Sequence, residues 1–247
     1  MNAYDTVLFD FGHTLVDLRA SDDALRQVYT RIRNHLTSLG YRGIPSVADM
    51  VRTVARRIDQ LIDESYRGTS LEELDITDLF GEVYREIGIS LPQKDIFDIV
   101  VMEHEALSAA MVVADGVKET LTALKKVGYR LGVVSNMTNL PEMMRRDLAR
   151  LELLQYFDVT VFSSATGIRK PHPRIYQVAL NGVQSVPTRT VFVGDRIRED
   201  VRGPQSLGMR AVLSHQFRQE ELDGSRPEKV IQDITEIVGF MELVNSA

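Results

Sequence analysis

The stretch VLFDFGHTL, residues 7–15, decides the fold. Its opening run of Val, Leu and Phe predicts a buried strand of a parallel sheet. The run ends at Asp10, and Gly12 follows in the turn. Open α/β sheets bind their ligands outside the carboxyl ends of the strands. Asp10 is therefore predicted to lie in a ligand site.

Three later segments also end in polar side chains: a hydroxyl with an amide, an ammonium group, and two carboxylates. They are Ser135 and Asn136 after 131–134, Lys170 within 167–173, and Asp195 and Asp200 after 190–194. With Asp10 they provide a nucleophile, a donor to phosphate oxygens, a cation and an acidic metal site. This set suits phosphoryl transfer, in which positioning and charge neutralisation supply most of the catalysis.

The order of these residues resembles the four motifs of the haloacid dehalogenase superfamily, over most of the chain from residue 7 to about 212. The matching residues are Asp10 with Thr14, then Ser135, then Lys170, then Asp195 with Asp200. The resemblance implies an α/β hydrolase core with a cap inserted after the first motif. It also implies a Mg²⁺-dependent phosphatase that acts on a small phosphorylated metabolite through an aspartyl-phosphate intermediate.

The resemblance also assigns a role to each motif residue. Asp10 is the nucleophile, and Ser135 and Lys170 are the other two catalytic residues. The substrate-binding residues are Thr14, Ser135, Asn136 and Lys170, with the Thr14 hydroxyl also holding its loop. The metal ligands are Asp10, the carbonyl of Gly12, Asp195 and Asp200, the last acting through water or by orienting Lys170.

Ordinary structural roles compete with these assignments. The alternatives are a cap or turn for Asp10, Thr14 and Ser135, a solvated loop for Lys170, and a helix N-terminus for Asp195 and Asp200. We expect Arg169 to be a charge at the surface or just behind the site, and His172 to be a turn residue.

Hydrophobic periodicity predicts how the chain is organised. Amphipathic helices are expected in four stretches, residues 21–40, 46–68, 71–88 and 93–107. Strands are expected at 131–135, 159–163, 190–194 and 210–214, alternating with helices. We therefore expect a Rossmann-like parallel α/β core, residues 1–18 and 112–247. A helical bundle cap, residues 19–111, is inserted into it.

Composition excludes several classes of protein. The net charge of the 247 residues is −6, so no basic surface for nucleic acid is expected. Without cysteine, the chain has no disulfide, no thiolate metal site and no cysteine nucleophile. No apolar run reaches the ~20 residues of a membrane span. We expect a cytoplasmic monomer or homodimer whose partner is a small phosphorylated substrate, not nucleic acid or a membrane.

One position departs from the family pattern. Phosphatases of this family carry a second aspartate two residues after the nucleophile, which protonates the leaving group and then activates water. Gly12 occupies that position, and such a group contributes about 10²–10⁴-fold to the rate. His13 is a candidate substitute because imidazole titrates near neutral pH. Against it, consecutive residues point in different directions.

Other functions stay open at this stage. A non-catalytic phosphate-binding or regulatory protein would explain Gly12 but would not need all four motifs. A 2-haloacid dehalogenase-type hydrolase uses no metal, and such relatives lack an aspartate at the position of Asp195. A phosphonate-cleaving enzyme requires a cap lysine, and the insertion has Lys94 alone, late in its sequence.

The substrate is not readable from the sequence. Five cap residues are candidate specificity contacts, with a solvated helix face as the alternative. They are Arg19, Arg56, Arg57, Tyr66 and Arg67. If the arginines reach the site, they predict an acidic substrate.

Overall fold

The α/β part of the chain is built on a six-stranded sheet. The computed structural model describes residues 3–18 and 21–246. The strand order is β5-β4-β1-β6-β7-β8, and each neighbouring pair of strands is parallel. The strands are β1 (Thr6–Phe9), β4 (Arg130–Ser135), β5 (Val159–Phe162), β6 (Thr190–Gly194), β7 (Arg210–Ser214) and β8 (Lys229–Ile231).

Strand β1 lies inside the sheet, with β4 on one side and β6 on the other. Its side chains from Thr6 to Phe9 are all buried, as expected for a strand covered on both faces. The chain passes from β1 to β4 and β5 on one side, and then to β6 on the opposite side of β1. Crevices for ligands form at the carboxyl ends of strands where the order reverses in this way.

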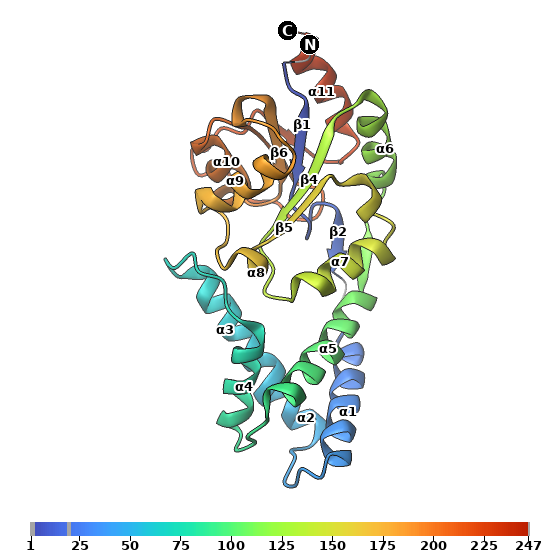
Figure 1. The fold of residues 1–247 in the computed structure, drawn as a ribbon, viewed down its shortest axis with the longest axis vertical. Helices are drawn as coiled ribbons and strands as arrows, with labels where there is room; N and C mark the ends of the chain where they lie inside the picture. The colour runs from blue at the N-terminus through green and yellow to red at the C-terminus, as the bar shows by residue number, and fades with distance from the viewer. Residues whose placement is uncertain (1–2, 19–20, 247) are drawn as a thin grey trace. The chain divides into compact units, whose positions relative to one another are not determined.

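Helices cover both faces of the sheet (Figure 1). Helices α9 (Pro173–Gly182) and α10 (Gly203–Ser206) lie on one face, and α6 (Val117–Val127) and α11 (Glu236–Ser246) on the other. The remaining elements are α7 (Pro141–Arg150), α8 (Ser163–Thr166), the 3₁₀ turns η2 (Leu154–Tyr156) and η3 (Pro187–Arg189), and the π-helical turn η4 (Ile197–Arg202). Strands β2 (Val16–Leu18) and β3 (Met111–Val113) form a separate two-stranded sheet.

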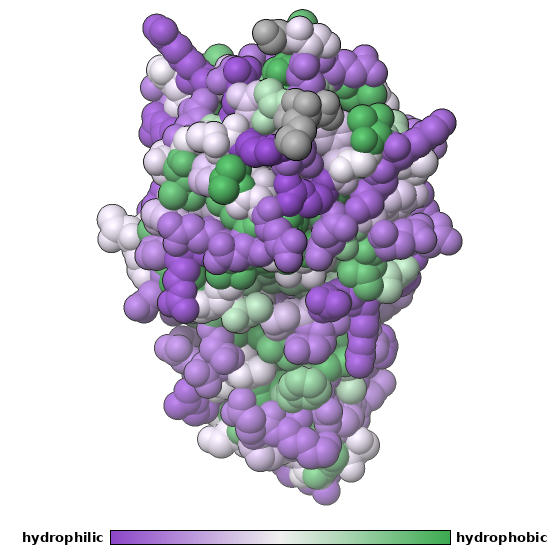
Figure 2. Space-filling view, turned by 45° about the horizontal axis from the view of Figure 1, so that its top comes forward, coloured by the Kyte–Doolittle hydropathy of each residue, from purple (hydrophilic) through white to green (hydrophobic). Residues whose placement is uncertain are grey.

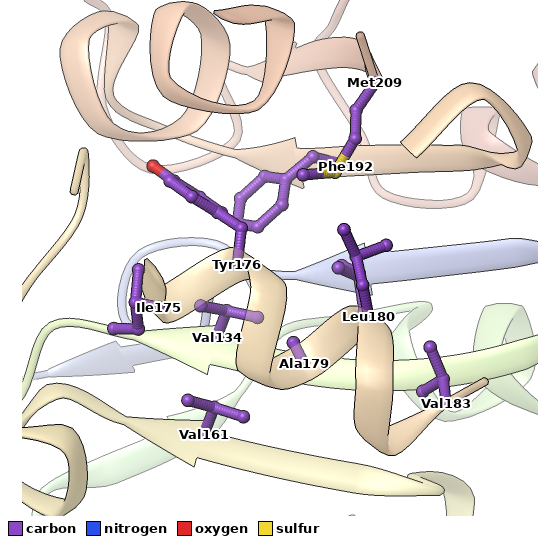
Figure 3. Close-up of a cluster of buried hydrophobic side chains, with 10 residues drawn as sticks. Val134, Val161, Ile175, Tyr176, Ala179, Leu180, Val183, Phe192 and Met209 are labelled. Carbon is purple, nitrogen blue, oxygen red and sulfur yellow. The ribbon is translucent and has the colours of Figure 1, made fainter. Parts of the chain in front are cut away.

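Helix α9 closes one hydrophobic core of this sheet, as Figure 3 shows. His172 caps the helix by accepting a hydrogen bond from the Arg174 backbone N–H, and Pro173 occupies the first turn. The apolar residues of α9 recur at helical spacing and are buried against Val134, Val161 and Phe192. They are Ile175, Tyr176, Ala179 and Leu180.

The insertion between β2 and β3 is helical. Its elements are α1 (Asp22–Ser38), α2 (Val47–Met50), the π-helical turn η1 (Val51–Ala55), α3 (Arg56–Arg67), α4 (Ile76–Glu86) and α5 (Gln93–Ala109). Ser21, Ser46 and Asp75 cap these helices by accepting hydrogen bonds from backbone N–H groups of the first turn. Helix α1 packs against α5, and α4 also packs against α5.

The chain divides into two compact units. One comprises Met1–Leu18, Leu71–Glu73 and Val112–Ala247, and the other Arg19–Ser70 and Leu74–Met111. The α/β fold class with an inserted helical part is confirmed. The division into a core domain and a cap domain with the predicted boundaries stays a prediction.

Two parts of the predicted organisation differ from the structure. The third helix was expected from residue 71, but α4 begins at Ile76 because Asp75 caps it, and Leu71–Glu73 lies outside the helical unit. Strands β2, β3 and β8 were not predicted. Each has three residues, which is too short for an alternating pattern to stand out.

The outer surface is mostly polar. Hydrophilic residues dominate the face shown in Figure 2, and hydrophobic ones form small patches between them. Within the described part of the chain, no helix combines the length and the apolar character needed to cross a membrane.

Truncation of Leu180 tests the core under α9. Leu180→Ala should lower the free energy of unfolding by about 2–5 kcal/mol, because it removes buried methyl groups and leaves a cavity. Val178 lies on the same helix but is 39% exposed, so Val178→Ala should change this free energy by no more than about 0.5 kcal/mol. Urea unfolding measures both, and equal losses would contradict the described packing.

Candidate active site

The site lies where three neighbouring strands end. Strands β4, β1 and β6 are paired so that Phe9 lies opposite both Val133 and Val193. The backbone N–H of Asp10 donates to the Val193 carbonyl at 2.9 Å, which extends the β1–β6 ladder by one residue. Parallel pairing therefore brings the polar residues that follow these strands to one edge of the sheet.

Backbone hydrogen bonds close the turn after β1. The N–H groups of Leu15 and Val16 donate to the Phe11 carbonyl at 2.9 and 3.2 Å, and the His13 N–H donates to the Val16 carbonyl at 2.7 Å. His13 has a φ of 57°, in the left-handed region. The Thr14 hydroxyl is buried and makes no hydrogen bond within the described residues. The loop is thus held by its backbone and not, as expected, by the Thr14 hydroxyl.

Lys170 lies at the centre of the site. Its Nζ donates to Oδ1 of Asp10 and to Oδ1 of Asp200, both at 2.6 Å. The Ser135 hydroxyl donates to the same oxygen of Asp10 at 3.0 Å. All four side chains are buried. A solvated loop lysine is therefore the wrong description of Lys170, because two carboxylates fix its ammonium group inside the protein.

Asn136 fixes the backbone that carries this lysine. Its Oδ1 accepts a hydrogen bond from the Lys170 N–H at 2.7 Å, and its Nδ2 donates to the Lys170 carbonyl at 3.1 Å. The loop after β4 and the loop before α9 are consequently joined by two hydrogen bonds. Sequence reasoning placed Asn136 among the substrate-binding residues, and in the structure its side chain holds the backbone of Lys170.

Burial and charge shift the acidity of the site. Although burial disfavours the charged amine, Asp10 and Asp200 raise the pKa of Lys170 above its ordinary value. Burial raises the pKa of Asp200 to about 6, with Lys170 opposing. Burial and the charges of Asp10 and Asp200 raise the pKa of Asp195 to about 8. Repulsion among the three buried carboxylates therefore adds to the effect of burial and favours their protonated forms.

Asp200 takes its position from a close approach to β6. A Cβ added to Gly194 would lie 2.3 Å from Cγ of Asp200, so any side chain at 194 would displace the carboxylate. Oδ2 of Asp200 accepts a hydrogen bond from the Arg196 N–H at 2.9 Å, at the start of η4. Asp200 therefore lies at a helix N-terminus, which was the structural alternative, and it also contacts Lys170, as the resemblance implied.

The three aspartates could hold a divalent cation. Asp10, Asp195 and Asp200 each offer an oxygen, and these oxygens lie within 4.8 Å of one another. Carboxylate oxygens are the ligands that hard cations such as Mg²⁺ prefer. Oδ2 of Asp195 is buried and accepts no hydrogen bond within the described residues. That oxygen and the mutual repulsion of the three carboxylates both fit a cation.

Arg218 is a site residue that sequence reasoning missed. Its Nη1 lies 3.0 Å from Oδ2 of Asp195, as an ion pair without hydrogen-bond geometry. Arg218 is on the chain between β7 and β8, and no motif surrounds it in the sequence. Contacts of this kind depend on the path of a loop, which local sequence does not specify.

His13 lies at the edge of the site. Its side chain is about one-third exposed, and Nδ1 is 3.8 Å from Oδ1 of Asp17. Burial lowers the pKa of His13, and Arg218 lowers it further against the opposing charges of Asp17 and Asp10. The imidazole is therefore mostly neutral at neutral pH, a form that accepts a proton more readily than it donates one.

The arginines suggested as specificity contacts are paired within the helical unit or lie outside the described residues. Arg19 lies outside the described residues. Arg56, Arg57 and Arg67 form exposed ion pairs within the helical unit, each with an N–O distance of 3.2 Å. Their partners are Asp22, Glu86 and Asp63, in that order. A role for these arginines and for Tyr66 in substrate choice stays a prediction.

A comparison with protein families gives a match over most of the chain. A model described as haloacid dehalogenase-like hydrolase matches residues 4–208. The chain belongs to this family. As a member, it is an enzyme of the hydrolase class, and the sequence resemblance is confirmed.

Relatives of this haloacid dehalogenase-like hydrolase align along nearly its whole length. It is 25% identical to the glyceraldehyde 3-phosphate phosphatase of Pyrococcus furiosus, over 99% of this chain and 94% of the relative. It is 26% identical to the pyrophosphatase PpaX of Bacillus mycoides, over 98% of each chain. A crystal structure of 2-haloacid dehalogenase from Pseudomonas syringae pv. Tomato DC3000 matches with a TM-score of 0.68 and 21% identity, over 97% of this chain and 99% of that one. The last comparison supports the fold.

The raised pKa of Asp195 predicts a pH-dependent stability. The folded protein keeps this proton to about pH 8, whereas the unfolded chain loses it near 3.8. Stability therefore falls as pH rises between these values. In protein freed of divalent cations with a chelator, Asp195→Asn should be more stabilising at pH 8 than at pH 5, as measured by urea unfolding.

Asp115→Asn is the matched control, because this aspartate is exposed and follows β3 in the same unit. It should show no such pH-dependent difference from the wild type. If Asp195→Asn raised the free energy of unfolding, relative to the wild type, by no more at pH 8 than at pH 5, the described burial of charge would be wrong.

Proposed function

We propose that this hydrolase is a Mg²⁺-dependent phosphatase acting on a small phosphorylated metabolite, with Asp10 as the nucleophile. The observation that carries the proposal is the position of the Asp10 carboxylate. Both hydrogen bonds that it accepts within the described residues, from Lys170 and Ser135, go to Oδ1. Oδ2 is thereby left for attack on phosphorus. The names of the two aligned phosphate-releasing relatives support the same class of reaction.

The proposed reaction has two steps. Oδ2 of Asp10 attacks phosphorus, the bond from phosphorus to the leaving oxygen breaks, and an aspartyl-phosphate forms. Water then attacks this phosphorus, which releases inorganic phosphate and restores the carboxylate. Lys170 and the Ser135 hydroxyl bind phosphoryl oxygens and offset their negative charge. When bound by Asp10, Asp195, Asp200 and the Gly12 carbonyl, Mg²⁺ would supply further charge neutralisation.

The residue at position 12 sets the proposed substrate preference. Glycine provides no proton for the leaving oxygen, and His13, whose pKa is lowered, holds little of the protonated form that could donate one at neutral pH. We therefore expect a preference for leaving groups that need no proton, such as those of acyl phosphates, aryl phosphates and phosphoric anhydrides. Cytoplasmic location and a monomeric or homodimeric state stay predictions.

Two alternatives are distinguished by experiment. Gly12 favours a non-catalytic protein that binds phosphate, for which the same residues would form a binding site. A dehalogenase-type hydrolase would use the Asp10 nucleophile on carbon, but the buried cluster of three aspartates argues against it. Release of phosphate decides among all three.

Substitution of the nucleophile is the first test. Wild-type protein should release phosphate from p-nitrophenyl phosphate and acetyl phosphate in the presence of Mg²⁺, and a chelator should abolish this activity. Asp10→Asn should lose it by at least about 10³-fold, because an amide does not form the intermediate. The exposed Asp115→Asn should keep the wild-type rate. Equal rates for Asp10→Asn and wild type would exclude the proposed mechanism, and no release by either would favour the binding protein.

Restoring a carboxylate at position 12 is a second test. A Cβ placed on Gly12 meets no atom within 4 Å, so an aspartate fits the turn. Gly12→Asp should raise kcat for an alkyl phosphate by about 10²-fold while changing the p-nitrophenyl phosphate rate far less, because general acid catalysis matters most for poor leaving groups. Gly12→Asn has the same shape without the acid and should give no gain. Equal gains for the two variants would refute the role of a missing acid.

A further inference from the structure

A short segment of the sequence between the helices belongs to the α/β unit. Residues Leu71–Glu73 lie in that unit although α3 precedes them and α4 follows. The Arg169 N–H donates to the Leu71 carbonyl at 2.8 Å, and the Glu73 N–H donates to the Gly167 carbonyl at 3.0 Å. The segment therefore pairs in antiparallel fashion with the loop that leads to Lys170.

The Glu73 side chain enters the interior from this segment. Its side chain is 1% exposed, and its Oε1 lies 4.0 Å from Nη1 of Arg169, whose side chain is 3% exposed. Arg169 is thus buried, so of its two expected places, at the surface or just behind the site, the surface is wrong. A carboxylate that leaves water requires a charged partner and hydrogen bonds. Both requirements are met here by residues of the loops that form the site.

The second oxygen of Glu73 reaches the loop after β4. The Ser163 hydroxyl donates to Oε2 of Glu73 at 2.5 Å and accepts from the Met137 N–H at 2.7 Å. Met137 follows Asn136, the residue that clamps the backbone of Lys170. Glu73 consequently contacts both site loops, one through Arg169 and the other through Ser163.

We propose that Glu73 is a positioning residue for the candidate active site. Its carboxylate fixes the loop of Asn136 and Met137, which begins directly after Ser135, relative to the loop of Lys170. Lys170 lies outside the strands, and Ser135 is the last residue of β4, so the sheet alone does not set the distance between the two loops. A displacement of about 1 Å between reacting groups costs about 10²-fold in rate. The inference rests on the proposed phosphatase function, because it deepens the account of the same site.

The test measures hydrogen exchange of loop amides and catalytic turnover on the same proteins. Glu73→Ala should increase hydrogen exchange of the Met137 and Arg169 amides about tenfold, because the loops lose a common anchor. It should lower kcat for p-nitrophenyl phosphate by about 10- to 100-fold. The rate is measured well below the unfolding temperature of each variant and referred to folded protein. A loss of stability alone would therefore not reproduce the result.

Two variants complete the experiment. Glu72→Ala removes the neighbouring carboxylate, which belongs to an exposed residue of the same segment, and should leave exchange and kcat unchanged. Ser163→Ala removes only the hydroxyl that links Glu73 to Met137. If Glu73→Ala does not fold, Ser163→Ala decides alone, with faster exchange of Met137 and a lower kcat expected.

The outcomes separate this proposal from the proposed function. A wild-type protein that hydrolyses neither p-nitrophenyl phosphate nor acetyl phosphate would overturn the phosphatase, and amide exchange would still decide whether Glu73 holds the two loops. Exchange in Glu73→Ala equal to that in Glu72→Ala would overturn the positioning role whatever the activity. Faster exchange with an unchanged kcat in an active enzyme would also overturn it.

Discussion

The site depends on the ion pairs that the buried ammonium group of Lys170 forms with two carboxylates. The ammonium group joins Asp10, which follows the central strand, to Asp200, which lies on the turn after β6. Without a cation between them, these carboxylates and Asp195 would be buried like charges, an arrangement that is strongly destabilising. The same contact orients the carboxylate of Asp10, the proposed nucleophile, and holds the ammonium group where phosphoryl oxygens would lie in the proposed reaction. Stability of the folded core and readiness for chemistry therefore rest on one ion pair network.

The two glycines of the site differ in the space around their Cα atoms. At Gly194 the space beside the Cα is filled by the Asp200 carboxylate, so packing alone requires glycine. At Gly12 that space is open, and packing gives no reason for glycine. The departure from the family pattern at position 12 leaves the network around Lys170 intact, since that network uses no carboxylate at this position. In the proposed reaction it would affect the leaving group.

Most of the fold and of the site could be predicted from sequence. Apolar runs ending in Asp10, Ser135 and Asp195 are local signals, and the geometry of parallel sheets converts them into a common location. Glu73 and Arg218 were missed because their contacts join residues far apart in the chain, which no local pattern encodes. Asp75 is a helix N-cap residue type, and starting the third helix after it would have excluded Leu71–Glu73 from that helix. It would not have shown which loop this segment joins.

The pairing of Leu71–Glu73 with the loop before Lys170 also changes the topology of the insertion. The chain crosses between the two units at four places instead of two. One long closed loop thereby becomes two shorter ones, which hold α1 to α3 and α4 to α5. The entropy lost on closing a loop grows with its length, so each of the two pieces has a smaller closure cost than the undivided insertion would have. An insertion of this kind can accept length changes in one piece without altering the ends of the other.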